Sequence, residues 1–239
     1  MKTGTLYLIP TNLSDGFTPT QILPASVIAT ALRLNHFVAE NAKTARAFLK
    51  QLGIERPLLE VSILELNSQT PDNAISIMIA PLIAGHDVGL VSEAGAPGVA
   101  DPGALVVAMA HQHGITVVPL VGPSSILLGL MASGLNGQTF SFHGYLPQEK
   151  NERIKSISTL EKESRQRNMT QLFIETPYRN QALYADLLST LASSTLLCVA
   201  RDLTGHREYV RTMRIVEWKK NTVALEKLPT LFLLLAEPV

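Results

Sequence analysis

The chain has 239 residues, of which 46% are hydrophobic and 17% charged, and its 20 Lys and Arg balance its 20 Asp and Glu. A chain of this length can bury a core without metals or disulfides, and an intrachain disulfide is excluded because Cys198 is the only cysteine. The balanced charge excludes a protein that holds nucleic acid through a general basic surplus, although it leaves a local basic patch open. The apolar excess favours strands covered on both faces, or a hydrophobic subunit interface.

The N-terminus, Met1 to Thr5, runs directly into a strand-like segment and has neither the apolar core nor the cleavage site of a signal peptide. No stretch reaches the ~18 uninterrupted apolar residues that span a bilayer. We therefore expect a cytoplasmic protein with no membrane association. Cys198 lies in the apolar run 195–200, which predicts a buried and inert thiol.

Strand-like and helix-like segments alternate through the first half of the chain. Alternation at this spacing predicts a mainly parallel sheet with helices on both faces. In chain order the expected elements are strand Thr5–Pro10, helix Pro24–Asn35, strand His36–Glu40, helix Ala42–Gly53, strand Leu58–Leu66, helix Pro71–Gly85, strand Val88–Ser92, helix Ala104–His113, strand Ile115–Val121 and helix Ser124–Gly134.

After about Leu120 the strands follow one another with shorter gaps, which indicates antiparallel pairing. The expected elements are strand Thr139–Pro147, a charged and solvated helix over Gln148–Arg167, and strands Met169–Pro177, Thr195–Leu203, Glu208–Trp218 and Pro229–Pro238. The predicted fold class is α/β with two domains. Residues 1–120 form an N-terminal domain with a parallel sheet flanked by helices, and residues 121–239 form a C-terminal domain with a mixed sheet and helices.

The loop of residues 91–103 is rich in glycine, alanine and proline, and it follows an expected strand and precedes an expected helix. Open α/β sheets bind ligands at this place, outside the carboxyl ends of their strands. Small residues there let a ligand approach the backbone. Asp101 before Pro102 is a candidate helix N-cap. The same composition is also compatible with an ordinary tight connection.

Four further segments end expected strands with small or polar residues. One, residues 117–125, opens a helix that Ser124 or Ser125 could cap, at the expected domain boundary. Each segment alone is compatible with a routine strand end, but together with the glycine-rich loop they predict one shared cleft. The others are Pro10-Thr11-Asn12, Glu175-Thr176-Pro177-Tyr178-Arg179 and Ala200-Arg201-Asp202-Leu203-Thr204.

In order and spacing, these segments resemble the tetrapyrrole (corrin/porphyrin) methylase family. Within it they are most similar to the branch that methylates a cytidine 2′-hydroxyl of small-subunit ribosomal RNA. The resemblance covers nearly the whole chain and depends on several motifs in register. They are Gly4–Pro10, Glu93-Ala94-Gly95-Ala96-Pro97 with Asp101-Pro102-Gly103, Pro119-Leu120-Val121-Gly122-Pro123-Ser124-Ser125, Gly144-Tyr145-Leu146-Pro147 and Ala200-Arg201-Asp202-Leu203-Thr204.

The resemblance implies two α/β domains, a homodimer, and S-adenosylmethionine held in the cleft between the domains. The absence of an early G-x-G-x-x-G motif is consistent with a methyltransferase that is not of the Rossmann type. The family positions that carry over as cofactor-binding residues are Pro10, Ala94, Gly95, Ala96, Val99, Ala100, Ser124, Ser125, Ala200 and Thr230.

The chain departs from the ribosomal branch where substrate would be bound. The loop after the first strand reads Thr11–Gly16 in place of a segment ending in Gly-Asn-Leu, and 40–43 read Glu-Asn-Ala-Lys in place of an acidic residue followed by Asp-Thr-Arg. Glu93 stands where the branch has aspartate. The branch also continues beyond its last strand, whereas the given sequence ends at Val239.

Methyl transfer from a sulfonium is an in-line displacement, so the protein must chiefly align donor and acceptor. No metal is required, and the six histidines show no ligand spacing. An alcohol acceptor needs a base within hydrogen-bond reach. Candidates are Glu93, Glu40 and Glu175, each of which could also be a surface carboxylate or a cap.

Arg179 and Arg201 could bind phosphate or carboxylate through a bidentate fork, or pair with the neighbouring Glu175 and Asp202.

Three functions stay open at this point. The first is an S-adenosylmethionine-dependent methyltransferase acting on RNA or another cytoplasmic acceptor. The second is a methylase of a tetrapyrrole precursor. The third is a non-catalytic protein that binds S-adenosylmethionine.

Overall fold

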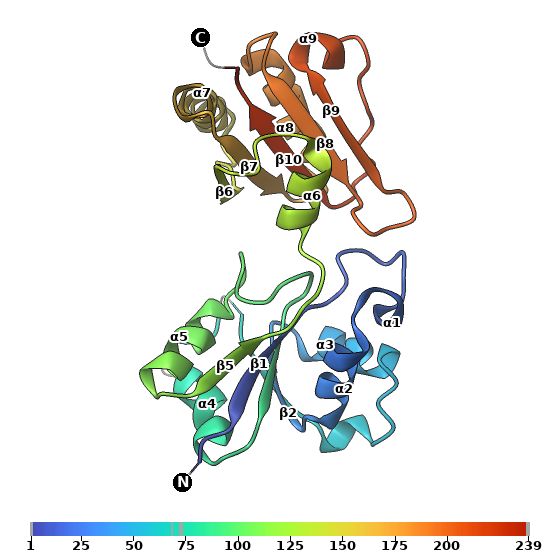
Figure 1. Cartoon of the computed structure of the whole chain (residues 1–239), viewed down its shortest axis with the longest axis vertical. Helices are drawn as coiled ribbons and strands as arrows, with labels where there is room; N and C mark the ends of the chain where they lie inside the picture. The colour runs from blue at the N-terminus through green and yellow to red at the C-terminus, as the bar shows by residue number, and fades with distance from the viewer. Residues whose placement is uncertain (1, 68, 72–73, 238–239) are drawn as a thin grey trace. The chain divides into compact units, whose positions relative to one another are not determined.

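The computed structural model describes residues 2–67, 69–71 and 74–237. The chain divides into two compact units, Met1–Ser124 (unit 1) and Ser125–Val239 (unit 2). Both units combine one five-stranded sheet with helices (Figure 1). The α/β fold class expected from the sequence is therefore confirmed.

Unit 1 is built on a wholly parallel sheet with the strand order β3-β2-β4-β1-β5. Its elements in chain order are β1 (Thr5–Ile9), α1 (Pro19–Ile22), α2 (Ala25–Arg33), β2 (His36–Ala39), α3 (Ala42–Gln51), the 3₁₀ helix η1 (Leu58–Glu60), β3 (Ser62–Glu65), α4 (Ile75–Ile83), β4 (Val88–Val91), α5 (Ala104–Gln112) and β5 (Thr116–Pro119).

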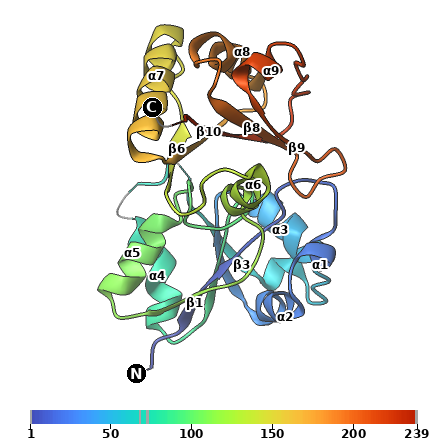
Figure 2. The ribbon, with the colours of Figure 1, turned by 45° about the horizontal axis from the view of Figure 1, so that its top comes forward.

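Helices cover both faces of this sheet, with α2 and α3 on one face and α4 and α5 on the other (Figures 1 and 2). Successive strand residues alternate between the two cores because side chains in a strand point to opposite faces. In β2, Phe37 and Ala39 belong to the core under α2 and α3, whereas Val38 belongs to the core under α4 and α5.

The strands β1 and β4 are neighbours in the sheet, yet their connections leave on opposite faces. The chain passes from β1 through α1 and α2 on one face, and from β4 through α5 on the other. This arrangement is a topological switch point, where the loops at the carboxyl ends of two adjacent strands diverge and leave a crevice for a ligand.

Unit 2 is built on a mixed sheet with the order β6-β7-β10-β8-β9, in which only β6 and β7 are parallel. Its elements are α6 (Ser125–Ser133), β6 (Phe140–Tyr145), α7 (Lys150–Arg167), β7 (Thr170–Glu175), α8 (Asn180–Thr190), β8 (Leu196–Arg201), β9 (Tyr209–Arg214), α9 (Ile215–Trp218) and β10 (Thr230–Leu235).

The core of unit 2 lies between the sheet and helices α7, α8 and α9. Trp218 is fully buried there and donates its indole N–H to the Leu197 carbonyl oxygen at 2.8 Å. Helix α6 packs on the sheet where Gly129 leaves no side chain, because a Cβ there would collide with the side chain of Leu231 in β10. Cys198 is fully buried, as predicted, and burial raises the pKa of its thiol to about 11.

Two expected strands are only partly strands. The segment Leu58–Leu66 begins with the 3₁₀ helix η1, because Pro57 precedes it and its backbone closes a turn from Pro57 O to Glu60 N. The segment Glu208–Trp218 leaves the sheet at Arg214 and turns into α9, where the Glu217 side chain accepts the Arg214 backbone N–H.

Helix α8 was not predicted. Its polar and apolar residues follow no clear helical stripe, because Asn180 and Asp186 are buried together with its leucines. The expected helix Pro71–Gly85 is observed from Ile75 to Ile83, and positions 72–73 lie outside the described residues. The expected last strand is observed as Thr230–Leu235, and Pro238 also lies outside the described residues.

A buried ion pair joins α7 to α8 in unit 2. The Arg153 guanidinium donates to Asp186 Oδ2 at 2.8 Å from Nε and 2.6 Å from Nη2, and the exposed fractions of the two residues are 8% and 6%. Arg153 Nη1 donates to the Gln148 carbonyl oxygen at 2.7 Å. The pair therefore also fixes the chain that enters α7.

Replacing one partner of this pair leaves a buried charge without compensation. We expect Arg153→Gln to lower the free energy of unfolding of unit 2 by about 3 kcal/mol. Trp218, the only tryptophan, reports this transition by fluorescence during urea unfolding. The control is Arg207→Gln in the exposed pair with Glu226, which should cost less than about 1 kcal/mol. Equal effects of the two variants contradict this account of unit 2.

Candidate functional site

The loops that follow β1 and β4 are joined at the carboxyl edge of the unit 1 sheet. Thr11 and Gly95 form an isolated antiparallel bridge, with Thr11 N donating to Gly95 O at 2.9 Å. The Thr11 hydroxyl donates to the Ser92 carbonyl oxygen at 3.2 Å, and the Ser92 hydroxyl donates to the Gly95 carbonyl oxygen at 2.9 Å. Thr11 and Ser92 are buried, so these polar groups form a fixed support beneath the switch point.

The backbone of the glycine-rich loop is unusual over a short distance. Gly95, Gly98 and Ala100 all have positive φ angles, of 74°, 80° and 58°. The conformation is accessible to glycine but costs an alanine about 1 kcal/mol or more. Strain of this kind concentrates at ligand-binding sites, where the surrounding structure holds it.

The proposed capping role of Asp101 is wrong. Helix α5 begins at Ala104 with Gly103 at the N-cap. Asp101 Oδ1 accepts the backbone N–H groups of Gly98 and Gly103 at 2.8 and 2.7 Å, so it braces the loop before the helix. Burial raises the pKa of the Asp101 carboxyl above its ordinary value, and the two backbone hydrogen bonds oppose that shift.

Glycine also allows the loop after β5 to approach the other two loops. A Cβ added to Gly95 would lie 2.9 Å from Leu13 Cδ2 and 3.5 Å from the Pro123 carbonyl oxygen, and one added to Gly122 would collide with the Pro10 ring. Within unit 1 the structure therefore brings together three of the segments singled out in the sequence.

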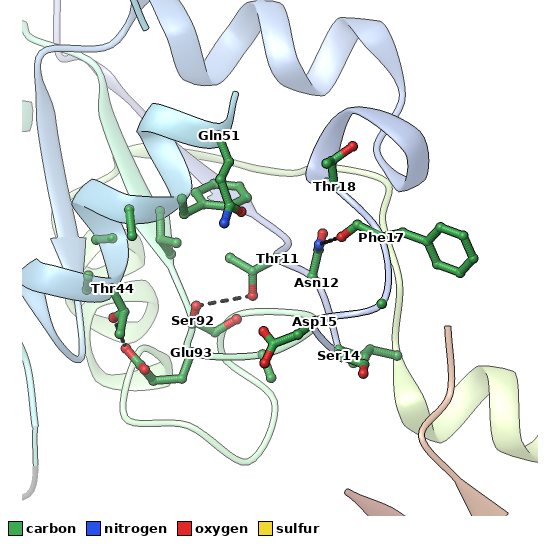
Figure 3. Close-up of a pocket in the computed structure, with 18 of the residues that line it drawn as sticks. Thr11, Asn12, Ser14, Asp15, Phe17, Thr18, Thr44, Gln51, Ser92 and Glu93 are labelled. Atoms are coloured by element: carbon green, nitrogen blue, oxygen red, sulfur yellow. Dashed lines mark hydrogen bonds between the residues drawn. The ribbon is translucent and has the colours of Figure 1, made fainter. Parts of the chain in front are cut away.

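A pocket of about 730 Å³ opens beside these loops (Figure 3). Its volume lies within the range of small-molecule sites. Figure 3 shows Gln51 facing Thr11 across the hollow, with Asp15 and Glu93 along one side and the ring of Phe17 turned outward. The lining residues come from the loop after β1, from α1 and α3, from the ends of β2 and β4, and from the start of the loop after β4: Thr11, Asn12, Leu13, Ser14, Asp15, Gly16, Phe17, Thr18, Gln21, Ala39, Thr44, Ala45, Ala47, Phe48, Gln51, Val91, Ser92, Glu93 and Ala94.

Two of the candidate bases lie at this edge of the sheet. Glu93 lines the pocket, and its Oε1 accepts the Thr44 hydroxyl at 2.6 Å. Burial raises the pKa of the neighbouring Glu40 carboxyl above its ordinary value, and the negative charge of Asp101 adds to the increase. A hydrogen bond from the Glu93 backbone N–H opposes the increase. The edge thus carries negative charge on groups that are close enough to affect one another.

The third candidate base, Glu175, belongs to unit 2 and is held in an ion pair. Its carboxylate is buried and accepts the Thr176 N–H and the Arg179 guanidinium, both at 2.6 Å. The expected alternative pairing of Arg179 with Glu175 is therefore confirmed. Arg201 pairs with Glu226 at 3.8 Å and stacks over Tyr209, and Asp202 Oδ2 accepts the Arg207 N–H.

The remaining predicted cofactor residues of unit 2 lie on the sheet and on α6. Ser125 begins α6, Ala200 lies in β8, and Thr230 begins β10 opposite Arg201 and Glu175. Ala200 and Thr230 have exposed fractions of 1% and 5%. In unit 1, Pro10 and Gly95 are buried, whereas Ala94, Val99 and Ala100 are exposed, and Ala96 and Ser124 are intermediate. Their role as cofactor ligands stays a prediction.

Sequence reasoning missed the part that α3 plays in the pocket. Thr44, Ala47 and Gln51 lie on one face of that helix and line the hollow. The signal was present as small and polar residues at helical spacing in a helix whose other apolar residues are buried, but nothing in the sequence shows which sheet edge that face meets.

Within the described residues, no cluster of three or more His, Cys, Asp or Glu side chains is arranged to hold a metal ion. None of the helices in that part of the chain combines the length and apolar character needed to cross a bilayer.

Proteins of known name are similar over most of the chain. A "Ribosomal RNA small subunit methyltransferase I" of Xylella fastidiosa is 34% identical over 84% of this chain and 69% of its own length. Proteins of the same name from Buchnera aphidicola and Halalkalibacterium halodurans are 30% and 32% identical, over 92% and 87% of this chain and 73% and 68% of their own lengths. No model of a protein family matches the chain.

Among solved structures, the methyltransferase CobJ matches with a TM-score of 0.62 and 15% identity, over 98% of this chain and 95% of its own. That likeness concerns the fold. The fold and the relatives together define a methyltransferase of the tetrapyrrole methylase type, as the sequence motifs indicated. More narrowly, the chain belongs to the family of ribosomal RNA small subunit methyltransferase I.

The raised pKa of Glu40 predicts a pH-dependent cost to folding. A carboxyl whose pKa is higher in the folded state favours folding while protonated, and this contribution is lost as the pH rises through the folded-state pKa. We therefore expect Glu40→Gln to raise stability relative to the native chain more at pH 7 than at pH 4. Thermal unfolding followed by circular dichroism at the two pH values measures the difference. A larger gain at pH 4 contradicts a pKa of Glu40 that is raised in the folded state.

Proposed function

We propose that this protein transfers a methyl group from S-adenosylmethionine to small-subunit ribosomal RNA, at a ribose 2′-hydroxyl. Membership of the family supports the reaction class, and the names of the relatives suggest the substrate. The observation that carries the proposal is the strained, glycine-rich loop after β4, held against the loop after β1 at a topological switch point.

The residues at this edge of the unit 1 sheet suit a methyl donor that contacts the protein backbone. Ala94 and Ala96 offer N–H and C=O groups with little side chain in the way, while Gly95 between them holds the turn through its hydrogen bonds to Thr11 and Ser92. We propose that Pro10, Val99, Ala100 and Ser124 of unit 1 contribute further contacts, and that Ser125, Ala200 and Thr230 of unit 2 do the same. The proposal takes 1–120 and 121–239 as the two domains of the family.

When bound, the sulfonium supplies a methyl carbon whose bond to sulfur breaks as a bond to the acceptor oxygen forms, leaving S-adenosylhomocysteine. The protein's residues align the acceptor and take up its proton. Alignment alone is worth about 7–11 kcal/mol of the barrier. A positioned general base contributes a further factor of about 10² to 10⁴.

Glu93 is the proposed base, because it lines the pocket and the Thr44 hydroxyl orients its carboxylate. Glu40 lies beside it and raises the local negative charge. Glu175 is less suited, since its carboxylate is buried and engaged with Arg179. The same acidic edge disfavours a multiply carboxylated tetrapyrrole precursor as substrate, because Asp15 and Glu93 would repel it.

We also propose that the protein acts in the cytoplasm as a homodimer. Ribosomal RNA as the substrate supports the location, and the resemblance to the tetrapyrrole methylases supports the dimer. Sedimentation of the purified chain measures the second point: a monomer at micromolar concentration contradicts it.

Gly95→Asp should abolish binding of S-adenosylmethionine, because a side chain there would press against Leu13, separate the loops after β1 and β4, and add negative charge beside Glu93. Isothermal titration calorimetry measures the binding. The control is Gly53→Asp, which places the same side chain at a similar positive φ of 89° with no neighbour within 4 Å. Native affinity in Gly95→Asp removes this loop from the donor site, and loss in both variants contradicts the local explanation.

Glu93→Gln should lower the rate of methyl transfer by about a hundredfold and leave the affinity for S-adenosylmethionine unchanged, because the amide cannot take up the acceptor's proton. The assay follows labelled methyl transfer to small ribosomal subunits that lack the corresponding methylation. Glu60→Gln, at an exposed position in η1, is the matched control. A native rate in Glu93→Gln rules out Glu93 as the base. Equal labelling of methylated and unmethylated subunits by the native chain contradicts the proposed substrate.

A further inference from the structure

The chemistry of the unit 1 pocket differs from that of a phosphate site. Its lining residues are all described, and none of them is Lys, Arg or His. Two carboxylates, Asp15 and Glu93, line the hollow and would repel an anion. A phosphate group is therefore a poor occupant of the interior.

The same pocket suits a flat, neutral group with a polar edge. One part of its wall is apolar, from Ala39, Ala45, Phe48 and Val91. Other parts carry neutral hydrogen-bonding groups, which are the side-chain amides of Asn12, Gln21 and Gln51. Amide and carboxylate side chains are the groups that proteins use to recognise the edges of nucleobases. Base faces are apolar enough to lie against alanine, valine and phenylalanine.

Helix α3 carries a basic stripe directly beside the face that lines the pocket. Arg46 and Lys50 follow Lys43 by three and seven residues, so the three side chains project within about 60° of one another around the helix. Ala47, which lines the pocket, lies about 40° from Lys43 around the helix. The helix contains no acidic residue, and no described carboxylate forms an ion pair with any of the three cations.

We infer that unit 1 binds one unstacked nucleotide of single-stranded RNA, with its base in the pocket and the flanking phosphates on the Lys43, Arg46 and Lys50 stripe. The separation of charge supports this occupant: the interior accepts neutral hydrogen-bonding groups, and the cations lie outside it on the adjacent helix face. The pocket volume of about 730 Å³ is large enough for a nucleoside. Single-stranded RNA is recognised in this way, through splayed bases and contacts to the backbone.

The inference rests on the proposed function, because it assigns the RNA-binding surface of the same enzyme. It also reconciles an RNA substrate with a chain of zero net charge, since three cations on one helix face make a local patch. A free anion would use the stripe but not the pocket, whose carboxylates repel it.

The test measures binding of fluorescein-labelled hexacytidylate to the full chain by fluorescence anisotropy. Ala47→Phe fills the pocket from an exposed helical position, and Gln51→Leu removes one hydrogen-bonding group with little change in size. The matched control is Ala29→Phe, which adds the same ring at an exposed alanine of α2 outside the pocket. We expect Ala47→Phe to weaken binding about tenfold, which is the equivalent of one or two lost hydrogen bonds. Gln51→Leu should weaken it by a smaller factor, and Ala29→Phe should leave it unchanged.

A second measurement tests the stripe. Replacing Lys43, Arg46 and Lys50 together by Gln should make the slope of log affinity against log salt shallower by about 2, because each phosphate contact to a single strand contributes about 0.7. The control replaces Lys150, Lys155 and Lys162 of α7 by Gln, which changes the net charge equally in unit 2. This control should keep the native slope.

Binding of S-adenosylmethionine is measured for every variant. Native RNA affinity in both Ala47→Phe and Gln51→Leu overturns the inference. It is also overturned if Ala47→Phe loses S-adenosylmethionine and still binds RNA, because the pocket would then belong to the methyl donor. Equal salt slopes in the two triple variants also overturn it. None of these results contradicts the proposed function as long as the native chain still methylates ribosomal subunits. A native chain that binds no donor and transfers no methyl group overturns the proposed function instead.

Discussion

The hydrogen-bonded contact between Thr11 and Gly95 is the constraint on which the site depends. It joins the loop after β1 to the loop after β4 at the point where the two connections leave the sheet on opposite faces. The buried hydroxyls of Thr11 and Ser92 complete the contact, so neither loop can move without leaving polar groups unpaired. The positive φ angle of Gly95 persists because this framework holds it.

The same framework assigns binding of the methyl donor and binding of the acceptor to two neighbouring parts of the sheet edge. The glycine-rich loop presents backbone groups and little side chain, which suits a donor that must lie close to the main chain. The pocket beside it presents hydroxyl, amide and carboxylate groups from the loop after β1 and from α3, which suits an acceptor. Glu93 lies at the border of the two and is oriented by Thr44. Positioning and proton transfer therefore come from neighbouring residues of one sheet edge.

Most of the fold was predictable from the sequence, because the strands of unit 1 are buried on both faces and read as short apolar runs. Failures arose where tertiary contacts decide the structure. Helix α8 buries Asn180 and Asp186, and the Arg153 that pairs with Asp186 lies 33 residues away. Asp101 braces the loop because its carboxylate reaches two backbone N–H groups, a choice that capping preferences cannot reveal. The glycine-rich loop was recognised from composition, whereas the contribution of α3 to the pocket depends on the sheet order β2-β4-β1.

The most direct test of the central claim is hydrogen exchange of the full chain with and without S-adenosylhomocysteine, read at the level of individual peptides. If the loop at the switch point holds the methyl donor through its backbone, the amides of residues 94–100 exchange more slowly when the ligand is present, while those of helix α7 in unit 2 are unchanged. Unchanged exchange at residues 94–100 under saturating ligand contradicts the account.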